Sequence, residues 1–466
     1  MSNDGAPALA VVGCVNMGKS SIVATLVEDD AILIAPEAGS TIDCAAYDLR
    51  LGDDAVFTLI DTPGFQNARR ALAWMTKWLE KDGNGNATPT AAVRAFHQEM
   101  KRSEAFAHEV RLLQPILEQG TGVLYVVDGT QPYLQRYEAE MRILAMTGAP
   151  RMGVINLHGD ASPHADEWEE AIKPWLKAVR FDAMKANADA RLRLFASFSG
   201  VDDSWRPIVE RALDKLEKER SGRHDLAAAA ISHLLIDALS MKEEAVLKTD
   251  RDGQVKELSE KLFERLRERE RKARTEVEAL YRHNRLERAE GALSLIDKDL
   301  LDRDQWRLMG LSATQLASAG AAAGALAGGV IDASVGGASF LAGTLIGAAV
   351  GGVGAVWGGQ SLAKVQVLGT PLGGRLLRVE APPGPQFPFV LLDRALVHWR
   401  LVAGRAHARR DALDVTEVAS GVVSNLSNDR RKVLSRLFGT IRKRDGDLVE
   451  ADRQTLIRRV RELSPD

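Results

Sequence analysis

Cysteine is scarce in this chain, and so is any excess of one charge. The 466 residues include only two cysteines, Cys14 and Cys44, which excludes a small disulfide-stapled scaffold and suits a reducing cytoplasm. The 61 Lys and Arg residues nearly balance the 64 Asp and Glu residues, so the formal net charge is −3. A chain with this balance has no overall attraction to nucleic acid or to acidic membranes.

The start of the chain lacks the features of an export signal. Residues 1–13 contain no basic segment and no long apolar core, so we expect no secretory signal peptide there. The apolar run at residues 6–12 is too short to span a bilayer. His158, His164 and His407 show no metal-site spacing, and no Ser–His–Asp set suggests a hydrolytic triad.

The most informative stretch that is present lies at residues 11–20. It fits the phosphate-binding pattern Gly-x-x-x-x-Gly-Lys-Ser at Gly13, Gly18, Lys19 and Ser20. The glycines let backbone N–H groups turn toward phosphate oxygens. Lys19 would reach the β- and γ-phosphates, and the Ser20 hydroxyl would ligate Mg²⁺. An apolar run precedes the loop and a helical pattern follows it, which is the context that this pattern needs.

A second signal of the same kind follows about forty residues later. The apolar run at residues 55–60, predicted to be a strand, ends in Asp61-Thr62-Pro63-Gly64. Asp61 at a strand end would hold Mg²⁺ through water, and the Gly64 N–H would sense a γ-phosphate. Asp-x-x-Gly alone is common, but at this distance from a phosphate loop it is specific.

Residues 1 to about 200 alternate apolar runs with amphipathic patterns. This alternation predicts an α/β domain, with a mostly parallel sheet covered by helices on both faces. Besides the two strands above, strands are predicted over residues 45–51, 122–128, 152–156 and 192–197. Further helices are predicted over residues 133–146, 165–179 and 205–218. The last helix closes a domain that spans residues 1–222.

A helical insertion at about residues 66–120 separates Gly64 from the next core strand, where a short connection would suffice. Residues 68–79 predict one helix, and Thr88 begins a long helix that runs toward Gln114. The insertion is joined directly to the predicted γ-phosphate sensor. We therefore expect it to move with the nucleotide state, the alternative being that it only covers the sheet.

The rest of the chain is predicted to be largely α-helical. Residues 223–308 form an arm that is too charged for a continuous coiled-coil seam, so we expect it to be solvated. Residues 309–361 differ abruptly, because Asp332 is the only charge in the glycine-rich part of this window. Glycines recur there at every fourth position, at Gly320, Gly324 and Gly328 and again at Gly343, Gly347 and Gly351.

Glycines four residues apart lie on one helix face and let a second helix approach closely. Residues 309–361 therefore predict an apolar helical hairpin that is long enough to enter a bilayer. The alternative is a glycine-packed pair buried in a soluble domain. Residues 362–466 predict a small β and turn element and then, from Pro388, helices with about five net positive charges. These charges would hold anionic headgroups or simply be solvated.

With the phosphate loop, Thr41 and the Asp61–Gly64 tetrapeptide in place, residues 1 to about 200 resemble the TrmE–Era group of translation-factor-related GTPases. The resemblance implies binding of GTP and GDP, with Thr41 joining Ser20 and Asp61 at Mg²⁺. Asn16 matches an asparagine that helps several members of the group to bind K⁺. The resemblance also leaves open the formation of a homodimer through this domain.

Two positions depart from the pattern of that group. Phe65 stands where Ras-type proteins place a water-orienting glutamine, so intrinsic hydrolysis should be slow unless another group supplies charge. In the base-reading motif, Asn156 is present, Leu157 replaces lysine and Asp160 stands one place late. Guanine is expected, with the choice against adenine left open. The last base-contacting loop has only a degenerate counterpart, at Phe195-Ala196-Ser197.

The expected site combines catalytic, nucleotide-binding and metal-binding residues. Catalytic roles fall to Lys19, Thr41 and Gly64. Nucleotide contacts are expected from Gly13, Asn16, Met17, Gly18, Lys19, Ser20, Ser21, Asn156 and Asp160. Mg²⁺ would be held by Ser20, Thr41 and Asp61, and K⁺ by Asn16.

The whole chain also resembles a bacterial family of GTPases of unassigned function, which carry a glycine-zipper stretch in a C-terminal domain of unknown function. The residues that carry this resemblance are the Gly320–Gly351 repeats and the segment at residues 387–411. We expect a cytoplasmic GTPase that acts as a switch and is associated with the inner membrane, through lipid or a membrane protein. Two alternatives stay open: a nucleotide-gated membrane-inserting scaffold, and a ribosome- or RNA-associated GTPase.

Overall fold

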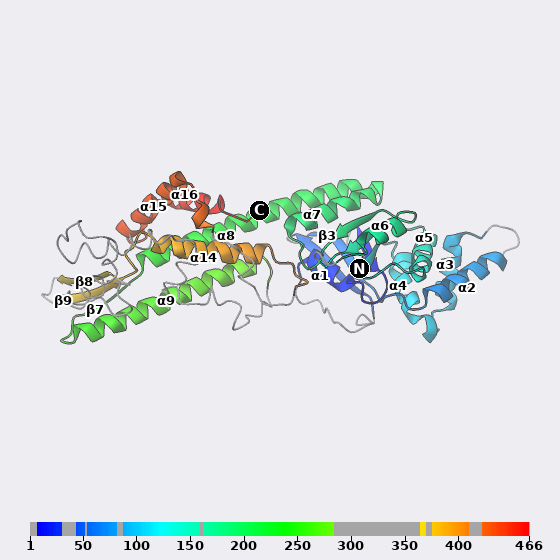
Figure 1. Ribbon diagram of the computed structural model, residues 1–466, viewed down its shortest axis with the longest axis horizontal. Helices are drawn as coiled ribbons and strands as arrows, with labels where there is room; N and C mark the ends of the chain where they lie inside the picture. Colours follow the sequence, from blue (N-terminus) through cyan, green and yellow to red (C-terminus); the bar gives the residue numbers. More distant parts are fainter. Residues whose placement is uncertain are drawn as a thin grey trace, which may run out of the picture. The chain divides into compact units, whose positions relative to one another are not determined.

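The computed structural model of the chain describes residues 7–29, 43–51, 54–81, 87–158, 162–283, 364–369, 375–409 and 422–465. The chain divides into two compact units (Figure 1). The first contains Met1–Gly222, Arg282–Arg285 and Ala403–Asp411, and the second contains Arg223–Tyr281, Leu286–Val402 and Ala412–Asp466.

A six-stranded sheet with the order β2-β3-β1-β4-β5-β6 forms the centre of the first unit. Its strands are β1 (Ala8–Val12), β2 (Ala45–Leu51), β3 (Asp54–Asp61), β4 (Gly122–Asp128), β5 (Arg151–Asn156) and β6 (Ala178–Phe181). All neighbours pair in parallel except β2 with β3. Every residue of β4 is buried, as a central parallel strand between two helical layers requires. The predicted α/β fold is confirmed.

Helices follow the strands on both faces of this sheet. They are α1 (Lys19–Val27), α5 (Arg136–Met146), α6 (Ala165–Ile172), α7 (Ala188–Ser197) and the first part of α8 (Arg206–Ser240). The strand predicted over residues 192–197 is wrong, because these residues lie in α7. The Asn187 side chain caps α7 by accepting from Ala190 N, and Phe195 then stacks on Phe57 with ring centroids 5.4 Å apart. Tertiary packing thus uses this apolar run as a helix face.

The insertion between β3 and β4 is helical, as predicted, but its long helix is broken. It comprises α2 (Ala68–Lys81), α3 (Pro89–Glu99), the short 3-10 helix η1 (Glu104–Phe106) and α4 (Ala107–Glu118). The break lets Phe96 of α3 meet Phe106 edge to face, with ring centroids 5.2 Å apart, and Trp74 of α2 packs on Phe96 in the same way. α2 also packs against α5, so the insertion is a folded layer of this unit (Figure 1).

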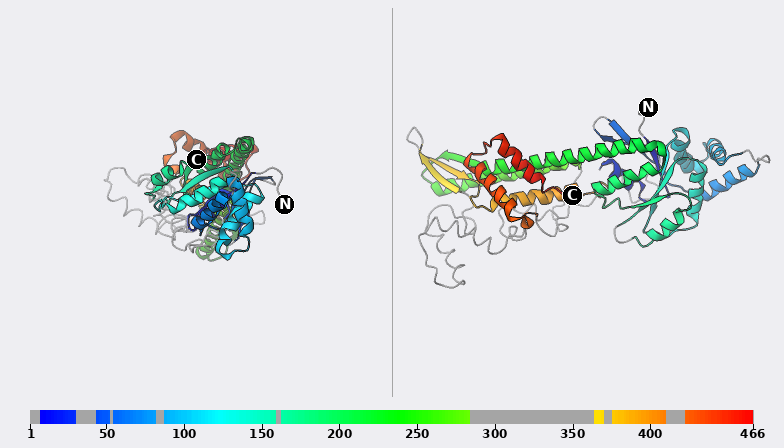
Figure 2. Two further views of the ribbon diagram at one scale, coloured as in Figure 1. Left: turned by 90° about the vertical axis from the view of Figure 1, so that its right-hand side faces the viewer. Right: turned by 90° about the horizontal axis from the view of Figure 1, so that it is seen from above.

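The second unit joins helices to a small antiparallel sheet with the order β7-β9-β8. Its described elements are the rest of α8, β7 (Lys242–Val246), α9 (Arg251–Leu280), β8 (Lys364–Gly369), β9 (Arg375–Glu380), α14 (Phe387–Ala403), η5 (Val423–Asn425), α15 (Asn428–Lys443) and α16 (Glu450–Arg461). Figure 2 shows β8 and β9, in yellow, at one end of this unit.

The charged helix α9 is not solvated on all sides, contrary to the sequence-based expectation. Leu262 and Phe263 pack with Leu377 and Val379 of β9 in one buried cluster. Farther along α9, the buried Glu270 accepts a hydrogen bond from Arg394 of α14 at 2.8 Å. The many charges of α9 therefore hide an apolar stripe and a buried ion pair.

Among the helices that the structure describes, none combines the length and apolarity needed to span a membrane. The predicted glycine-rich hairpin at residues 309–361 lies outside the described residues.

Candidate functional site

The phosphate loop lies between β1 and α1 and has the backbone shape that its glycines predict. Gly18 has φ +82°, and a Cβ there would lie 2.2 Å from Asn156 Nδ2. A Cβ on Gly13 would lie 2.3 Å from the carbonyl oxygen of Val126. Both positions therefore require glycine. Asn16 at the exposed turn also has positive φ, +64°, which asparagine tolerates better than most residues.

Lys19 begins α1 and folds back across the loop. Its Nζ donates to the Cys14 carbonyl oxygen at 2.9 Å, and burial lowers the pKa of the amine while the Asp61 carboxylate opposes that shift. Met17 anchors the other side, because its Sδ accepts from Asp128 N at 3.2 Å. The loop is thus held against β4, with a cation lying across it.

Ser20 and Asp61, predicted to share Mg²⁺, lie in direct contact. Ser20 Oγ donates to Asp61 Oδ2 at 2.7 Å, although 41 residues separate them in sequence. The contact arises because β1 and β3 are parallel neighbours, so the loops at their carboxyl ends meet. A hydroxyl and a carboxylate are hard oxygen donors that suit Mg²⁺, which usually takes one or two protein ligands and keeps water or phosphate for the rest. No group of three or more His, Cys, Asp or Glu side chains that could hold a metal ion lies within the described part of the chain.

The tetrapeptide after β3 lies directly on the phosphate loop. A Cβ on Gly64 would lie 2.7 Å from the backbone nitrogen of Val15, so this approach also requires glycine. The next residue, Phe65, donates its N–H to the Gly13 carbonyl oxygen at 3.1 Å. Its side chain is only 2% exposed, so the ring packs into the core and offers no polar group to a water molecule.

Of the two predicted base-reading residues, the structure describes only Asn156. Asn156 is buried, and its Oδ1 accepts from Ala183 N at 3.3 Å, which joins the end of β5 to the loop after β6. Its Nδ2 has no hydrogen-bond partner among the described residues. Asp160 and Thr41 lie outside the described residues, so their predicted roles stay predictions.

Sequence reasoning placed the last base-side loop wrongly. Phe195-Ala196-Ser197 lies in α7, whereas the loop that follows the sixth strand begins at Asp182. The Asp182 carboxylate accepts from Met184 N at 2.9 Å and Lys185 N at 3.1 Å, which makes a tight turn. The sequence feature that could have located this loop is the short strand β6 followed by Asp182-Ala183. It was missed because a helix was predicted over residues 165–179, which overlaps the start of β6. That helix ends at Ile172.

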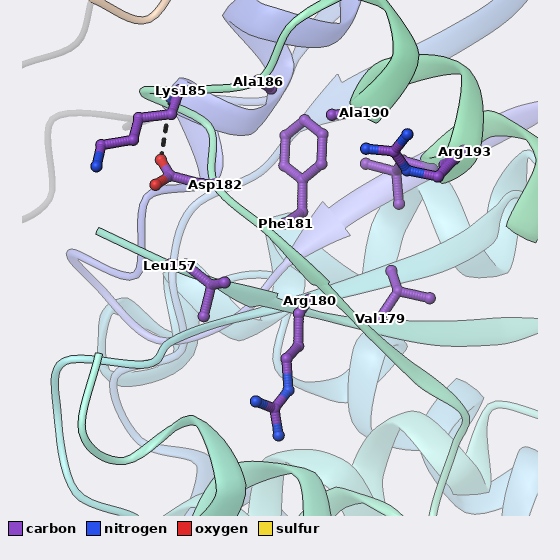
Figure 3. Close-up of a pocket in the computed structure, with 10 residues that line it drawn as sticks. Leu157, Val179, Arg180, Phe181, Asp182, Lys185, Ala186, Ala190 and Arg193 are labelled. Carbon is purple, nitrogen blue, oxygen red and sulfur yellow. Dashed lines mark hydrogen bonds between the residues drawn. The ribbon is translucent and has the colours of Figure 1, made fainter. Parts of the chain in front are cut away.

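A cavity of about 360 Å³ lies beside this loop, between β6 and α7 (Figure 3). Apolar side chains, including Leu157, Phe181 and Leu194, form much of its wall. Lys185 and Arg193 add positive charge to the lining. The cavity therefore adjoins Leu157, which follows β5, and the loop after β6.

A buried carboxylic acid lies behind the phosphate loop. Glu140 of α5 accepts a hydrogen bond from the Tyr125 hydroxyl at 3.1 Å, and burial raises the pKa of its carboxyl to about 8. Burial, helped by Glu140, also raises the pKa of the Cys14 thiol. Cys14 is thus kept as a thiol, which is a poor nucleophile.

Comparison with known proteins agrees with the geometry of the first unit. Residues 8–156 match the family described as 50S ribosome-binding GTPase. Two curated relatives, both named GTPase Der, come from Azotobacter vinelandii and Pseudomonas aeruginosa. They are 26% identical over 162 residues and 24% identical over 194 residues, covering 34% and 38% of this chain. The matches span only 32% and 39% of the relatives' own lengths.

Two solved Era structures also align with the chain. One is an Era variant from Aquifex aeolicus bound to GDP and AlF4−, with a TM-score of 0.25, 16% identity, and coverage of 59% of this chain and 88% of that chain. The other is Era in complex with MgGDPNP and a segment of 16S ribosomal RNA, with a TM-score of 0.25, 17% identity, and coverage of 59% and 89%. The assignment of the first unit rests on its family match and on its strand order.

The family of the whole chain is shown by the match of its later part. Residues 175–462, well over half of the sequence, match the family described as Domain of unknown function, DUF3482. This match and that of residues 8–156 confirm the two resemblances inferred from the sequence. The chain therefore belongs to the DUF3482 family, and its N-terminal unit is a P-loop GTPase domain.

Proposed function

We propose that this protein is a Mg²⁺-dependent GTPase that uses GTP binding and hydrolysis as a conformational switch. The observation that carries the proposal is the 2.7 Å contact between Ser20 Oγ and Asp61 Oδ2, beside a loop that Lys19 spans. A hydroxyl, a carboxylate and an amine gathered at the strand ends are what a Mg²⁺–triphosphate complex needs. The two Der relatives, which are GTPases by name, support the same chemistry.

Each residue has a distinct role in this proposal. Lys19 neutralises charge on the β- and γ-phosphates, and the Gly64 N–H donates to the γ-phosphate. Ser20 and Asp61 hold the metal together with Thr41, and the bound Mg²⁺ would stabilise negative charge on the phosphates. The buried Phe65 ring cannot orient water, so we expect slow intrinsic turnover.

Two finer features of the site belong to the same proposal. Asn16, exposed at the turn of the loop, would bind K⁺. The bound ion would supply positive charge at the site, where Phe65 offers no polar group to orient water. Asn156 and Asp160 would read guanine. Turnover in potassium against sodium buffer tests the first feature, and binding of GTP against ATP tests the second. Equal rates in both salts would contradict K⁺ binding by Asn16. Equal affinities for GTP and ATP would contradict the reading of guanine by Asn156 and Asp160.

The direct experiment compares nucleotide binding by the wild-type protein and by Lys19→Ala. A fluorescent GTP analogue should bind the wild type in Mg²⁺, and the variant should bind at least tenfold more weakly because a phosphate-neutralising cation is lost. Lys173→Ala removes a surface cation whose side chain is 73% exposed and pairs with Glu170, so it serves as the matched control. Equal binding by Lys19→Ala and wild type would overturn the proposal.

A second candidate function, association with RNA or the ribosome, is favoured by one face of α15. Lys432, Arg436 and Lys443 are all exposed and lie at helical spacings of four and seven residues, so they share one face. Such a stripe suits a phosphate backbone. Binding to RNA should weaken steeply with salt, and replacing the three residues by glutamine should flatten that dependence. Salt-independent behaviour would exclude this candidate.

Membrane association and a homodimer through the GTPase domain are proposals that rest on the sequence alone. The predicted apolar glycine-rich hairpin at residues 309–361 would contact an inner-membrane lipid surface or a membrane protein. Flotation of the full chain with lipid vesicles and a GTP analogue tests the first proposal, and a protein that never floats would exclude it. Sedimentation with and without the analogue tests the second.

A further inference from the structure

A buried carboxylate from the insertion holds the residues that follow Gly64. Glu109 of α4 is 1% exposed, and its Oε1 accepts two backbone hydrogen bonds. The donors are Gln66 N at 2.8 Å and Asn67 N at 2.5 Å. These two residues lie between Phe65 and the start of α2. The partners are 43 and 42 residues apart in sequence, so this contact joins the far side of the insertion to its entrance.

Ala105 of η1 and His108 of α4 also contact Gln66 and Asn67. The Ala105 carbonyl oxygen accepts from Asn67 Nδ2 at 2.9 Å. His108 Nε2 lies 3.2 Å from Gln66 Nε2 in a further hydrogen bond. Main-chain and side-chain groups of Gln66 and Asn67 are therefore both bound by the segment that begins α4. A geometry with four bonds to two residues is not an incidental packing contact.

Stability alone is a poor explanation for Glu109. A carboxylate taken out of water loses hydration, and its second oxygen, Oε2, has no hydrogen-bond partner among the described residues. The N–H groups that open α2 offset part of this cost, because the start of a helix favours negative charge. A neutral residue at position 109 would avoid the remaining free-energy cost of burying a charge. A group kept at such a cost points to a role in the site beside it.

The other end of this short segment is bound to the phosphate loop. Phe65 N donates to the Gly13 carbonyl oxygen at 3.1 Å, and Gly64 lies against the backbone of Val15. No residue lies between Phe65, held by the loop, and Gln66, held by Glu109. A displacement of α4 would therefore move Gln66 and, through the adjoining Phe65, Gly64.

We propose that Glu109 is a positioning residue for the γ-phosphate sensor: it fixes the Gly64 N–H, so that the insertion controls how the site distinguishes GTP from GDP. This inference rests on the proposed GTPase function. Glu109 touches neither the phosphates nor the metal, and it acts through Gln66 and Asn67. It makes α4 the element through which a partner on the insertion would alter turnover.

The test uses the full chain with Glu109→Ala and Glu109→Gln. Glu118→Ala is the matched control, because Glu118 lies on the same helix with its side chain 42% exposed. Glu109→Ala should weaken binding of the GTP analogue GDPNP by about tenfold, while GDP affinity changes by less than about twofold, since only the γ-phosphate meets Gly64. GTP turnover should fall by a similar factor. Glu109→Gln keeps an accepting oxygen and should recover most of the loss.

Hydrogen exchange gives a readout that needs no nucleotide. The amides of Gln66 and Asn67 should exchange faster in Glu109→Ala than in the wild type or in Glu118→Ala. An equal loss of GDP and GDPNP affinity, or unchanged exchange at these amides, would overturn the role of Glu109. If Glu109→Ala does not fold, Glu109→Asp shortens the reach by one methylene and should show the same selective loss, and an unchanged GDPNP to GDP ratio would overturn the proposal.

The two levels of the proposal fail differently. A wild-type protein that binds no GTP would overturn both the GTPase function and the role of Glu109 in it. A wild-type protein that hydrolyses GTP, with Glu109→Ala indistinguishable from it, would overturn only the role of Glu109.

Discussion

Replacing Glu140 by glutamine should make the stability of the GTPase domain much less dependent on pH. Glu140 is 3% exposed and accepts a hydrogen bond from the Tyr125 hydroxyl. Burial raises the pKa of its carboxyl from 4.5 to about 8, and the nearby positive charges of Lys19 and Arg136 reduce that rise without cancelling it. At neutral pH the folded protein therefore holds a proton that the unfolded chain has already released, because the unfolded carboxyl ionises near pH 4.5.

The sign and size of the effect follow from this shift. The folded-state pKa lies above the unfolded one, so the stabilisation is fully present below about pH 4.5 and is lost as pH rises through about 8. Across that window one extra bound proton gives a slope of about 1.4 kcal/mol per pH unit. Between pH 6 and pH 8 the wild type should lose about 2 kcal/mol more than Glu140→Gln, whose amide stays neutral.

The assay is urea unfolding of the full chain followed by tryptophan fluorescence, at several pH values from 5.5 to 8.5. The quantity compared is the difference in unfolding free energy between wild type and variant, which cancels titrations common to both. Glu170→Gln, at a side chain that is 75% exposed, serves as the control and should follow the wild type. Parallel pH profiles for wild type and Glu140→Gln would refute the reasoning, because they would mean that Glu140 ionises at an ordinary pH.

Two further substitutions test the site and the core. Gly18→Ala should lower nucleotide affinity at least tenfold, because the residue has φ +82° and its Cβ would lie 2.2 Å from Asn156 Nδ2; calorimetric titration with GDP would measure it, and an unchanged affinity would mean that the loop can rearrange. Phe195→Ala should destabilise the domain by about 3–5 kcal/mol, because its ring lies within 5.5 Å, centroid to centroid, of Phe57 and Phe198. Urea unfolding would measure the loss, and a change below about 1 kcal/mol would contradict this packing.

The part of the site that is local in sequence could be predicted from the residues. The phosphate loop follows from glycine spacing between an apolar strand and a helix, and β4 (Gly122–Asp128) coincides with its apolar run. The meeting of Ser20 and Asp61 was also predictable, because strand ends of a parallel sheet share one edge.

What sequence reasoning missed depends on tertiary contacts. The apolar run at residues 192–197 has no clear period, and the Asn187 cap together with packing on Phe57 makes it part of a helix instead of a strand. The hydrogen bonds from Gln66 N and Asn67 N to Glu109 join segments about forty residues apart, and no local sequence pattern predicts them. The charges of α9 concealed its buried stripe, because ion pairs such as Glu270 with Arg394 form only when the helices meet.

The central claim, that the site hydrolyses GTP, is tested most directly by phosphate release from GTP in Mg²⁺, measured for the wild-type chain and for Lys19→Ala prepared identically. The structure predicts slow but measurable release by the wild type and loss of at least tenfold in the variant, because Lys19 is the cation that spans the loop. Release by Lys19→Ala at the wild-type rate would contradict the account.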